Sequence, residues 1–141
     1  METKDRRAGS SRYEASSRKN ARESSQTSIL VVDDEENFLI LLHWFLTQRG
    51  YEVTTASSAD TALDLIDMRS FDVALLDLRL GVSDGLAVLD ELTARLPKIR
   101  VFMMTAYPTV NSIKQAFERG AVRYLTKPVD LQELAEALDS F

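Results

Sequence analysis

The stretch Ile29-Leu30-Val31-Val32-Asp33-Asp34 decides the fold of this chain. Its apolar residues run into two carboxylates without alternating with polar ones, which is typical of a strand buried on both faces. Three other apolar segments also lead into a reactive side chain: VALLD at residues 73–77, VFMMT at 101–105 and VRYLTK at 122–127. Strands buried on both faces indicate a parallel sheet that is covered by helices on each side.

The segments between these strands have helical spacing. We expect further strand residues at 51–56, 71–77 and 99–105, and a helix after each of five strands. Strands that alternate with helices imply one open parallel sheet with right-handed crossovers. Pro108 is expected in the first turn of the fourth helix, where its missing N–H costs nothing.

The carboxyl ends of the strands are where sites are built in an open α/β sheet. Three carboxylates, a hydroxyl and an ammonium are therefore expected to meet at one edge, and they belong to Asp33, Asp34, Asp77, Thr105 and Lys127. Carboxylates packed so closely repel one another unless a cation lies among them, and hard oxygen ligands suit Mg²⁺. A carboxylate beside Mg²⁺ and a lysine is equipped to accept a phosphoryl group.

The order, spacing and residue types of these motifs resemble the receiver domain of bacterial two-component response regulators. The resemblance covers roughly residues 28–141. It implies a flavodoxin-like α/β fold, in which a single open five-stranded parallel sheet of order 2-1-3-4-5 has helices on both faces. It places the site at the switch between the first and third strands.

The resemblance implies that Asp77 is the phosphoacceptor, which takes a phosphoryl group from the phosphohistidine of a sensor kinase or phosphotransfer protein. It implies that Asp34 and Asp77 bind Mg²⁺ directly, together with the backbone carbonyl of Arg79, and that Asp33 acts through water. The alternatives are that Asp77 merely ends a strand and that the Asp33-Asp34 pair caps the first helix.

The resemblance also implies a switch. Lys127 would pair with a phosphoryl oxygen, and Thr105 would donate its hydroxyl to the same group. Tyr124 would then turn inward and alter the face formed by the fourth helix, fifth strand and fifth helix. A cis peptide bond is expected between Lys127 and Pro128. The alternatives are a solvated lysine, a threonine at a strand end and a half-buried tyrosine.

The chain departs from the family in the loop after Asp77. Receivers commonly have proline four residues after the phosphoacceptor, where this chain has Gly81, which puts the ordering of the loop in doubt. Two other positions flank the path of the water that hydrolyses an aspartyl phosphate, and here they are the large residues Arg79 and Tyr107. We expect slow self-dephosphorylation, unless both side chains merely point to solvent.

The first helix is apolar along nearly its whole length. Phe38, Leu41, Leu42 and Phe45 form a stripe expected to face the sheet. Leu39, Ile40 and Trp44 would then point outward, as a patch for kinase docking or self-association or as ordinary scattered apolar residues. His43, on the same helix, is expected to be a surface residue.

Composition fits one globular domain with a core over residues 28–141, preceded by a disordered basic and serine-rich leader over residues 1–27. Residues 29–141 carry 18 acidic against 10 basic side chains, which argues against direct nucleic-acid binding by this part. The chain has no cysteine and no signal-peptide or membrane-spanning stretch, so we expect a cytoplasmic protein. The sequence leaves open whether it is a monomer or a homodimer.

The expected role is signalling, with no catalysis beyond the domain's own phosphoryl transfer and slow dephosphorylation. The output, by analogy transcriptional, lies outside these residues, or the receiver stands alone. A Mg²⁺-dependent phosphohydrolase of the haloacid dehalogenase type is an alternative, but it needs an Asp-x-Asp nucleophile motif, which neither Asp33 nor Asp77 begins. A receiver-like binding module that takes no phosphate and an FMN-binding flavodoxin fit the motifs less well.

Overall fold

A five-stranded parallel sheet forms the centre of the computed structural model, which describes residues 26–140. Its strands are β2 (Ser28–Val32), β3 (Glu52–Ala56), β4 (Val73–Asp77), β7 (Arg100–Thr105) and β8 (Arg123–Thr126). They are arranged in the order β3-β2-β4-β7-β8, and every neighbouring pair is parallel. In chain order this is 2-1-3-4-5, so the predicted fold is confirmed.

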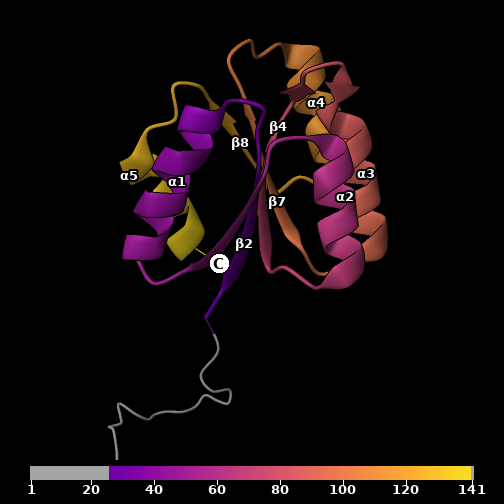
Figure 1. Cartoon of the computed structure of the whole chain (residues 1–141). Coiled ribbons are helices and arrows are strands. Elements are labelled where there is room, and N and C mark those ends of the chain that lie inside the picture. Colours follow the sequence, from indigo (N-terminus) through magenta and orange to yellow (C-terminus); the bar gives the residue numbers. More distant parts are fainter. Residues whose placement is uncertain (1–25, 141) are drawn as a thin grey trace, which may run out of the picture.

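Helices follow each of the five strands of this sheet in the chain and cover the sheet on both sides (Figure 1). They are α1 (Glu36–Gln48), α2 (Ala59–Met68), α3 (Gly85–Arg95), α4 (Val110–Glu118) and α5 (Leu131–Asp139). In Figure 1, α1 and α5 lie on one face, whereas α2, α3 and α4 lie on the other. Strand β3 is added on one side of β2, and β4 is added on the other side. The carboxyl ends of β2 and β4 therefore lie side by side at the point where the strand order switches.

Successive residues of the central strands point into two separate cores. Ile29 and Val31 pack on the side of α1 and α5, whereas Leu30 and Val32 pack on the side of α2 and α3. Every residue of β2 and β4 is buried. This two-sided burial is why these strands lack the alternation of polar and apolar residues that marks a half-exposed strand.

The inward face of α1 differs from the predicted one. The residues buried on that face are Leu39, Leu42 and Leu46. Leu39 is only 4% exposed and Leu41 is 43% exposed, so the predicted places of these two leucines are reversed. Ile40 and Trp44 are 64% and 59% exposed, as expected. His43 is exposed too. Residues 38–46 are nearly all apolar, so the sequence pattern left the rotation of the helix open.

Two local features also depart from the prediction. Helix α4 begins at Val110 after the N-cap Thr109, so Pro108 lies before the helix and not in its first turn. The reason is a capping box, in which Thr109 and Ser112 bond reciprocally to each other's backbone amides. The segment after Asp77, expected to be a loop, contains a short antiparallel pair, β5 (Arg79–Leu80) and β6 (Ser83–Asp84).

The leader predicted over residues 1–27 falls almost entirely outside the described residues, which begin at Gln26. The Gln26 side chain donates a hydrogen bond to the Gly50 carbonyl, and the Glu52 amide donates one to the Thr27 carbonyl.

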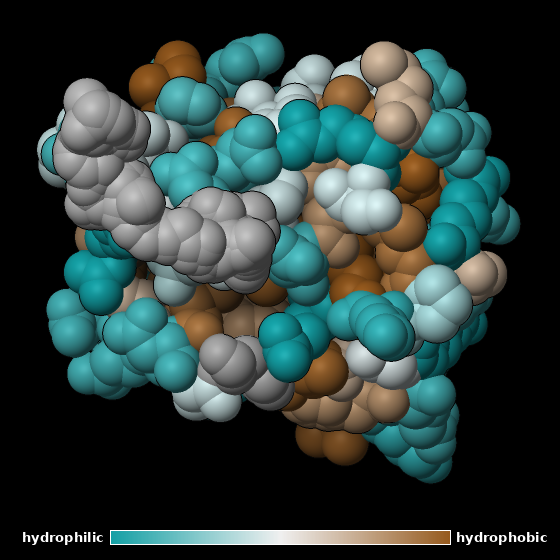
Figure 2. Space-filling model, turned by 90° about the horizontal axis from the view of Figure 1, so that it is seen from below, coloured by the Kyte–Doolittle hydropathy of each residue, from teal (hydrophilic) through white to brown (hydrophobic). Residues whose placement is uncertain are grey.

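Figure 2 shows the end of the molecule where the strands begin, on which apolar and polar side chains are mixed. Within residues 26–140, no helix is long and apolar enough to cross a bilayer.

Candidate functional site

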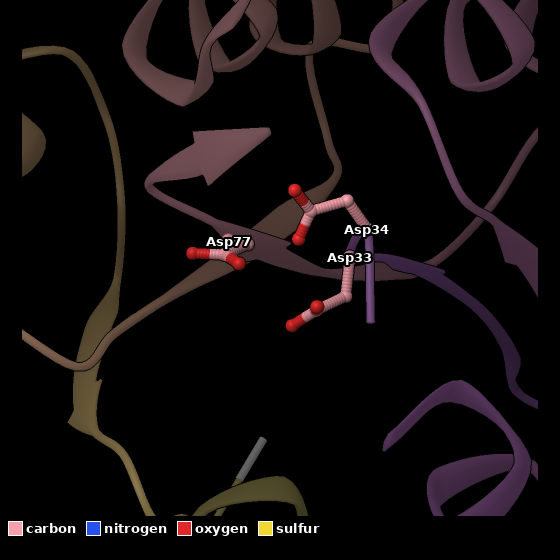
Figure 3. A group of neighbouring side chains, drawn as sticks. All are labelled: Asp33, Asp34 and Asp77. Atoms are coloured by element: carbon pink, nitrogen blue, oxygen red, sulfur yellow. The ribbon is translucent and has the colours of Figure 1, made fainter. Parts of the chain in front are cut away.

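Three carboxylates converge at the opposite end, where the strands finish (Figure 3). Asp77 is the last residue of β4, and Asp33 and Asp34 directly follow β2. One ligand oxygen from each lies within 4.8 Å of those of the other two. Asp33 is completely buried and Asp77 is 7% exposed, whereas Asp34 faces solvent. The predicted acidic cluster is thus brought together at the predicted edge.

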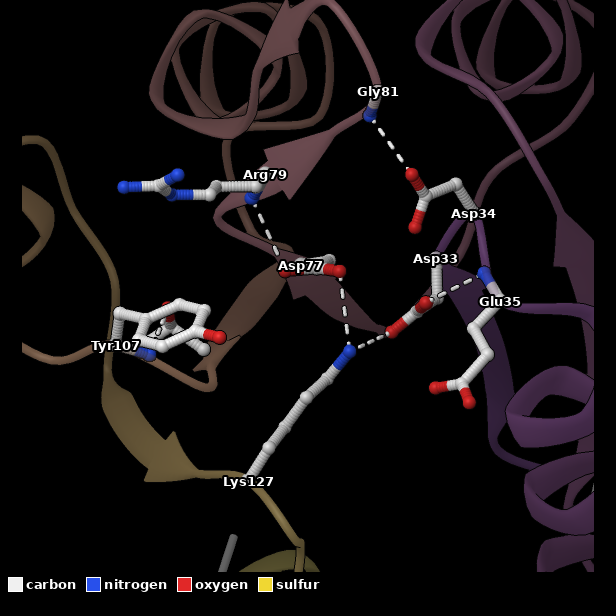
Figure 4. Close-up of polar contacts among 9 residues, drawn as sticks. Asp33, Asp34, Glu35, Asp77, Arg79, Gly81, Tyr107 and Lys127 are labelled. Carbon is white, nitrogen blue, oxygen red and sulfur yellow. Dashed lines mark hydrogen bonds and ion pairs between the residues drawn. The ribbon is translucent and has the colours of Figure 1, made fainter.

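Lys127 supplies the positive charge of this cluster. It follows β8, and its ammonium donates hydrogen bonds to Asp33 Oδ2 and, over 3.1 Å, to Asp77 Oδ2 (Figure 4). The ammonium also lies 4.8 Å from the centre of the Phe38 ring, a cation–π contact. The Lys127–Pro128 peptide bond is cis, as expected. Lys127 is therefore a partly buried, fully engaged side chain, and the alternative of a solvated lysine is wrong.

The charges in the cluster shift one another's ionisation. Burial raises the pKa of the Asp77 carboxyl; the Arg79 amide opposes that rise, the Asp33 charge adds to it, and Lys127 opposes it. Burial alone would lower the pKa of Lys127, but its bonds to Asp33 and then Asp77 outweigh burial and raise the pKa. The lysine therefore stays protonated, and Asp77 holds its negative charge at an energetic cost.

The two aspartates after β2 have different environments. Asp33 Oδ1 accepts a hydrogen bond of 2.9 Å from the Glu35 amide, whereas Asp34 Oδ2 accepts one of 2.9 Å from the Gly81 amide. Helix α1 is preceded by the N-cap Glu35, whose side chain makes no capping bond. Neither aspartate bonds to an amide within α1, and Asp33 instead holds the amide of the N-cap residue Glu35.

The acidic cluster suits a hard divalent cation. All three of its side chains offer carboxylate oxygens, the donors that Mg²⁺ and Ca²⁺ prefer. One lysine does not neutralise three ionised carboxylates, and the raised pKa of Asp77 reflects, after burial, the repulsion from Asp33. The residues present therefore fit a Mg²⁺ ion.

Thr105 and Tyr124 lie on neighbouring strands. Thr105 ends β7 and is 1% exposed, and its Oγ1 accepts a hydrogen bond of 3.2 Å from the Tyr107 amide. Tyr124 lies on β8 opposite Met103, and its hydroxyl is 2.9 Å from the hydroxyl of Ser112 in α4. Sequence reasoning missed Ser112, because a serine in the first turn of a helix carries no signal of a partner on a strand.

Arg79 and Tyr107 lie beside the acidic cluster. The Arg79 amide donates a hydrogen bond of 3.1 Å to Asp77 Oδ1. Its guanidinium carbon lies 5.7 Å from the centre of the Tyr107 ring, a cation–π contact (Figure 4). Tyr107 is 70% exposed. These two side chains thus cover one another at the rim of the site.

Gly85 is a residue whose importance to the site the sequence did not reveal. A Cβ atom at this position would lie 2.3 Å from the backbone oxygen of Asp77 and 2.8 Å from backbone atoms of Leu78. The Gly85 amide donates a hydrogen bond of 2.8 Å to the Leu78 carbonyl. The start of α3 therefore packs directly on the backbone of Asp77, and only glycine fits there.

Comparisons with known proteins all point to response regulators. The family model described as the response regulator receiver domain matches residues 29–139. The alginate biosynthesis transcriptional regulatory protein AlgB of Pseudomonas aeruginosa is 42% identical over 109 residues, which make up 77% of this chain and 24% of AlgB. The transcriptional regulatory protein ZraR of Escherichia coli O157:H7 is 40% identical over 111 residues, 79% of this chain and 25% of ZraR. The chain thus spans about a quarter of the length of these relatives.

Solved structures show the same fold. A response regulator from Burkholderia pseudomallei, solved with a phosphorylated aspartic acid, calcium ion and citrate, has a TM-score of 0.77 and 34% identity over 80% of this chain and 66% of that one. A CheY-like receiver domain from Methanospirillum hungatei has a TM-score of 0.80 and 30% identity over 82% of this chain and 93% of that one.

Proposed function

Because this chain belongs to the response regulator receiver domain family, we propose that Asp77 is its phosphoacceptor. The donor is the phosphohistidine of a sensor kinase or phosphotransfer protein. The observation that carries this proposal is the position of the Asp77 carboxylate, which ends a central strand beside Asp33, Asp34 and the Lys127 ammonium. The Burkholderia relative with a phosphorylated aspartic acid supports it.

In the proposed reaction, an Asp77 carboxylate oxygen forms a bond to phosphorus while the bond from phosphorus to the donor's imidazole nitrogen breaks. The electron pair of the broken bond returns to that nitrogen. The Arg79 amide holds Asp77 Oδ1 in place, and the Lys127 ammonium, now on Asp77 Oδ2, moves to a phosphoryl oxygen as charge develops there. The Arg79 amide is already in position, so this contact adds no cost of reorganisation during the transfer.

Asp34 and Asp77, with the backbone carbonyl of Arg79, are proposed to hold Mg²⁺ directly, and Asp33 through water. When bound, Mg²⁺ offsets the negative charge on the oxygens of the transferring group. Asp33 is buried and already engaged by Lys127 and the Glu35 amide, which suits the outer position. Asp34→Ala is therefore expected to weaken Mg²⁺ binding more than Asp33→Ala, and equal titration midpoints would contradict this assignment.

The signal is proposed to leave the site through Thr105 and Tyr124. The Thr105 hydroxyl turns to the phosphoryl group, and Tyr124 leaves its bond to Ser112, which is part of the capping box of α4. Loss of that bond would loosen the start of α4 and alter the surface formed by α4, β8 and α5. The transcriptional regulators AlgB and ZraR suggest that this surface controls transcription in the cytoplasm, through an output outside these residues.

Arg79 and Tyr107 are proposed to slow the hydrolysis of the aspartyl phosphate. Their side chains cover one another beside Asp77, where an attacking water would have to pass. The Arg79→Asn, Tyr107→Ala double variant should release phosphate faster than the wild-type protein. An unchanged rate of phosphate release from purified phosphoprotein would show that these side chains do not protect the aspartyl phosphate from hydrolysis.

Phosphoramidate offers a direct test, because it carries the same bond from phosphorus to nitrogen as phosphohistidine. With phosphoramidate and Mg²⁺, intact mass should show one added phosphoryl group on the wild-type chain. It should also show one on Asp67→Asn, a control that removes an exposed carboxylate paired with Arg95. Asp77→Asn should gain none, and a chelator should block the reaction. A wild-type chain that stays unmodified would favour the alternative of a receiver-like binding module.

A further inference from the structure

The segment after Asp77 reaches back to the acidic cluster. The β5–β6 hairpin turns at Gly81 and Val82, and the Gly81 amide donates its hydrogen bond of 2.9 Å to Asp34 Oδ2. These two residues are 47 positions apart in the chain. The contact therefore joins the loop after β4 to the loop after β2, across the candidate cation site.

The geometry at Gly81 requires both glycine-like backbone freedom and an N–H group. Its φ is +61°, in the left-handed region that side chains with a Cβ adopt only at a cost. A proline has a fixed φ of about −65° and no N–H, so it meets neither requirement. Space is not the constraint, because a Cβ at Gly81 would come no closer than 3.9 Å to Asp34 Oδ2.

Asp34 depends on this bond for its orientation. Its side chain is exposed, and within residues 26–140 the Gly81 amide is the hydrogen-bond donor that contacts it. An exposed carboxylate without such a bond would sample several rotamers. Figure 4 shows one Asp34 oxygen held by Gly81 while the other points toward Asp33 and Asp77.

We propose that Gly81 is a positioning residue for the cation site, whose backbone N–H sets the Asp34 carboxylate so that its second oxygen is ready to bind Mg²⁺. This inference rests on the cation site proposed above. The hairpin turn replaces the rigidity that proline gives this loop in other receivers. An ion then meets a carboxylate that is already ordered, and less conformational entropy is lost on binding.

Two variants of the full chain separate the N–H group from the side chain. Gly81→Pro removes the donor and the left-handed conformation together, whereas Gly81→Asn keeps the donor and tolerates that conformation. A third variant, Val82→Ala, changes the neighbouring, fully exposed turn residue and serves as the matched control. In Mg²⁺ titrations followed by NMR, Gly81→Pro should bind about five- to tenfold more weakly than wild type, a factor that corresponds to the roughly 1–1.4 kcal/mol of a typical hydrogen bond. Gly81→Asn should recover most of that affinity, and Val82→Ala should change it less than about twofold.

A second measurement needs no cation and no variant of the hairpin. In the Mg²⁺-free protein, the Gly81 amide should exchange its hydrogen about tenfold more slowly than in Asp34→Ala, because the carboxylate that protects it is gone there. This readout decides the matter if Gly81→Pro does not fold. Equal exchange rates, or Mg²⁺ affinity of Gly81→Pro within about twofold of wild type, would overturn the proposal.

Phosphorylation distinguishes this inference from the proposed function. At saturating Mg²⁺, Gly81→Pro should still accept a phosphoryl group from phosphoramidate, because Asp77 and Lys127 are unchanged. If Gly81→Pro is phosphorylated normally and binds Mg²⁺ as tightly as wild type, Gly81 is not a positioning residue, and the proposed function still stands. A wild-type chain that binds no Mg²⁺ would overturn both.

Discussion

Lys127→Met should destabilise the protein strongly, because the Lys127 ammonium offsets part of the negative charge of two buried carboxylates. Asp33 is completely buried and Asp77 nearly so, and both accept hydrogen bonds from the Lys127 ammonium. Methionine keeps most of the length of the side chain but removes the charge, and with it the cation–π contact to the Phe38 ring. The two carboxylates would then repel one another without compensation.

The expected loss can be worked out from the geometry. At the 3.1 Å that separates Lys127 Nζ from Asp77 Oδ2, Coulomb attraction at an effective dielectric constant of 20 amounts to about 5 kcal/mol. Desolvation of the ammonium cancels part of that attraction. Breaking a buried ion pair by removing one partner typically costs 3–5 kcal/mol, so we expect Lys127→Met to lower the free energy of unfolding by about 3 kcal/mol. That is a large part of the margin of roughly 5–15 kcal/mol of a typical domain.

Urea unfolding at pH 7 with a chelator present measures this loss. The midpoint should fall by about 1–2 M for a domain of this size. The control Lys98→Met removes an exposed lysine and should change the free energy of unfolding by less than about 0.5 kcal/mol. Adding Asp77→Asn to Lys127→Met should recover part of the loss, because fewer charges then repel. If Lys127→Met unfolds at the same urea concentration as Lys98→Met, the charge of Lys127 does not stabilise the acidic cluster.

Three further variants test other parts of the structure. Since burial raises the pKa of Asp77, its ionisation opposes folding. Asp77→Asn should therefore be more stable than wild type near pH 7, and this gain should shrink as the pH falls below the ordinary range of an aspartate pKa, where the wild-type carboxyl is protonated in both the folded and the unfolded state. A urea midpoint difference that does not change with pH would contradict this. Gly85→Ala should cost about 2–3 kcal/mol, because its Cβ would lie 2.3 Å from the Asp77 backbone oxygen, and an unchanged melting temperature would refute the close contact. Trp44→Lys should slow phosphotransfer from a partner kinase without affecting labelling by acetyl phosphate, because Trp44 is 59% exposed on α1 and is not part of the acidic cluster. If the kinase phosphorylates both proteins at the same rate and both are monomeric, this surface has no role.

The sheet and the acidic cluster could both be predicted from the sequence. Strands buried on both faces carry an unbroken apolar signal, as in Ile29–Val32, and parallel strands must end at a common edge. Residues that follow such strands, including Asp33 and Asp77, are therefore brought together by topology alone. The same reasoning placed Lys127 at the site, though it did not give its two partners.

Features that depend on one contact or on the rotation of a helix were not predictable. Nearly all of residues 38–46 are apolar, so hydrophobic spacing did not distinguish Leu39 from Leu41 as the buried residue. The β5–β6 hairpin has only two residues in each strand, too few to show a period. The Gly81 bond to Asp34 depends on a backbone amide, which has no sequence signature.

Locating the phosphoryl group in the chain tests directly whether Asp77 is the phosphoacceptor. After incubation with acetyl phosphate and Mg²⁺, borohydride converts an aspartyl phosphate to homoserine, and peptide mass spectrometry then locates that residue. We expect homoserine at position 77 alone, and none in Asp77→Asn. Homoserine at Asp33 or Asp34, or modification that persists unchanged in Asp77→Asn, would contradict it.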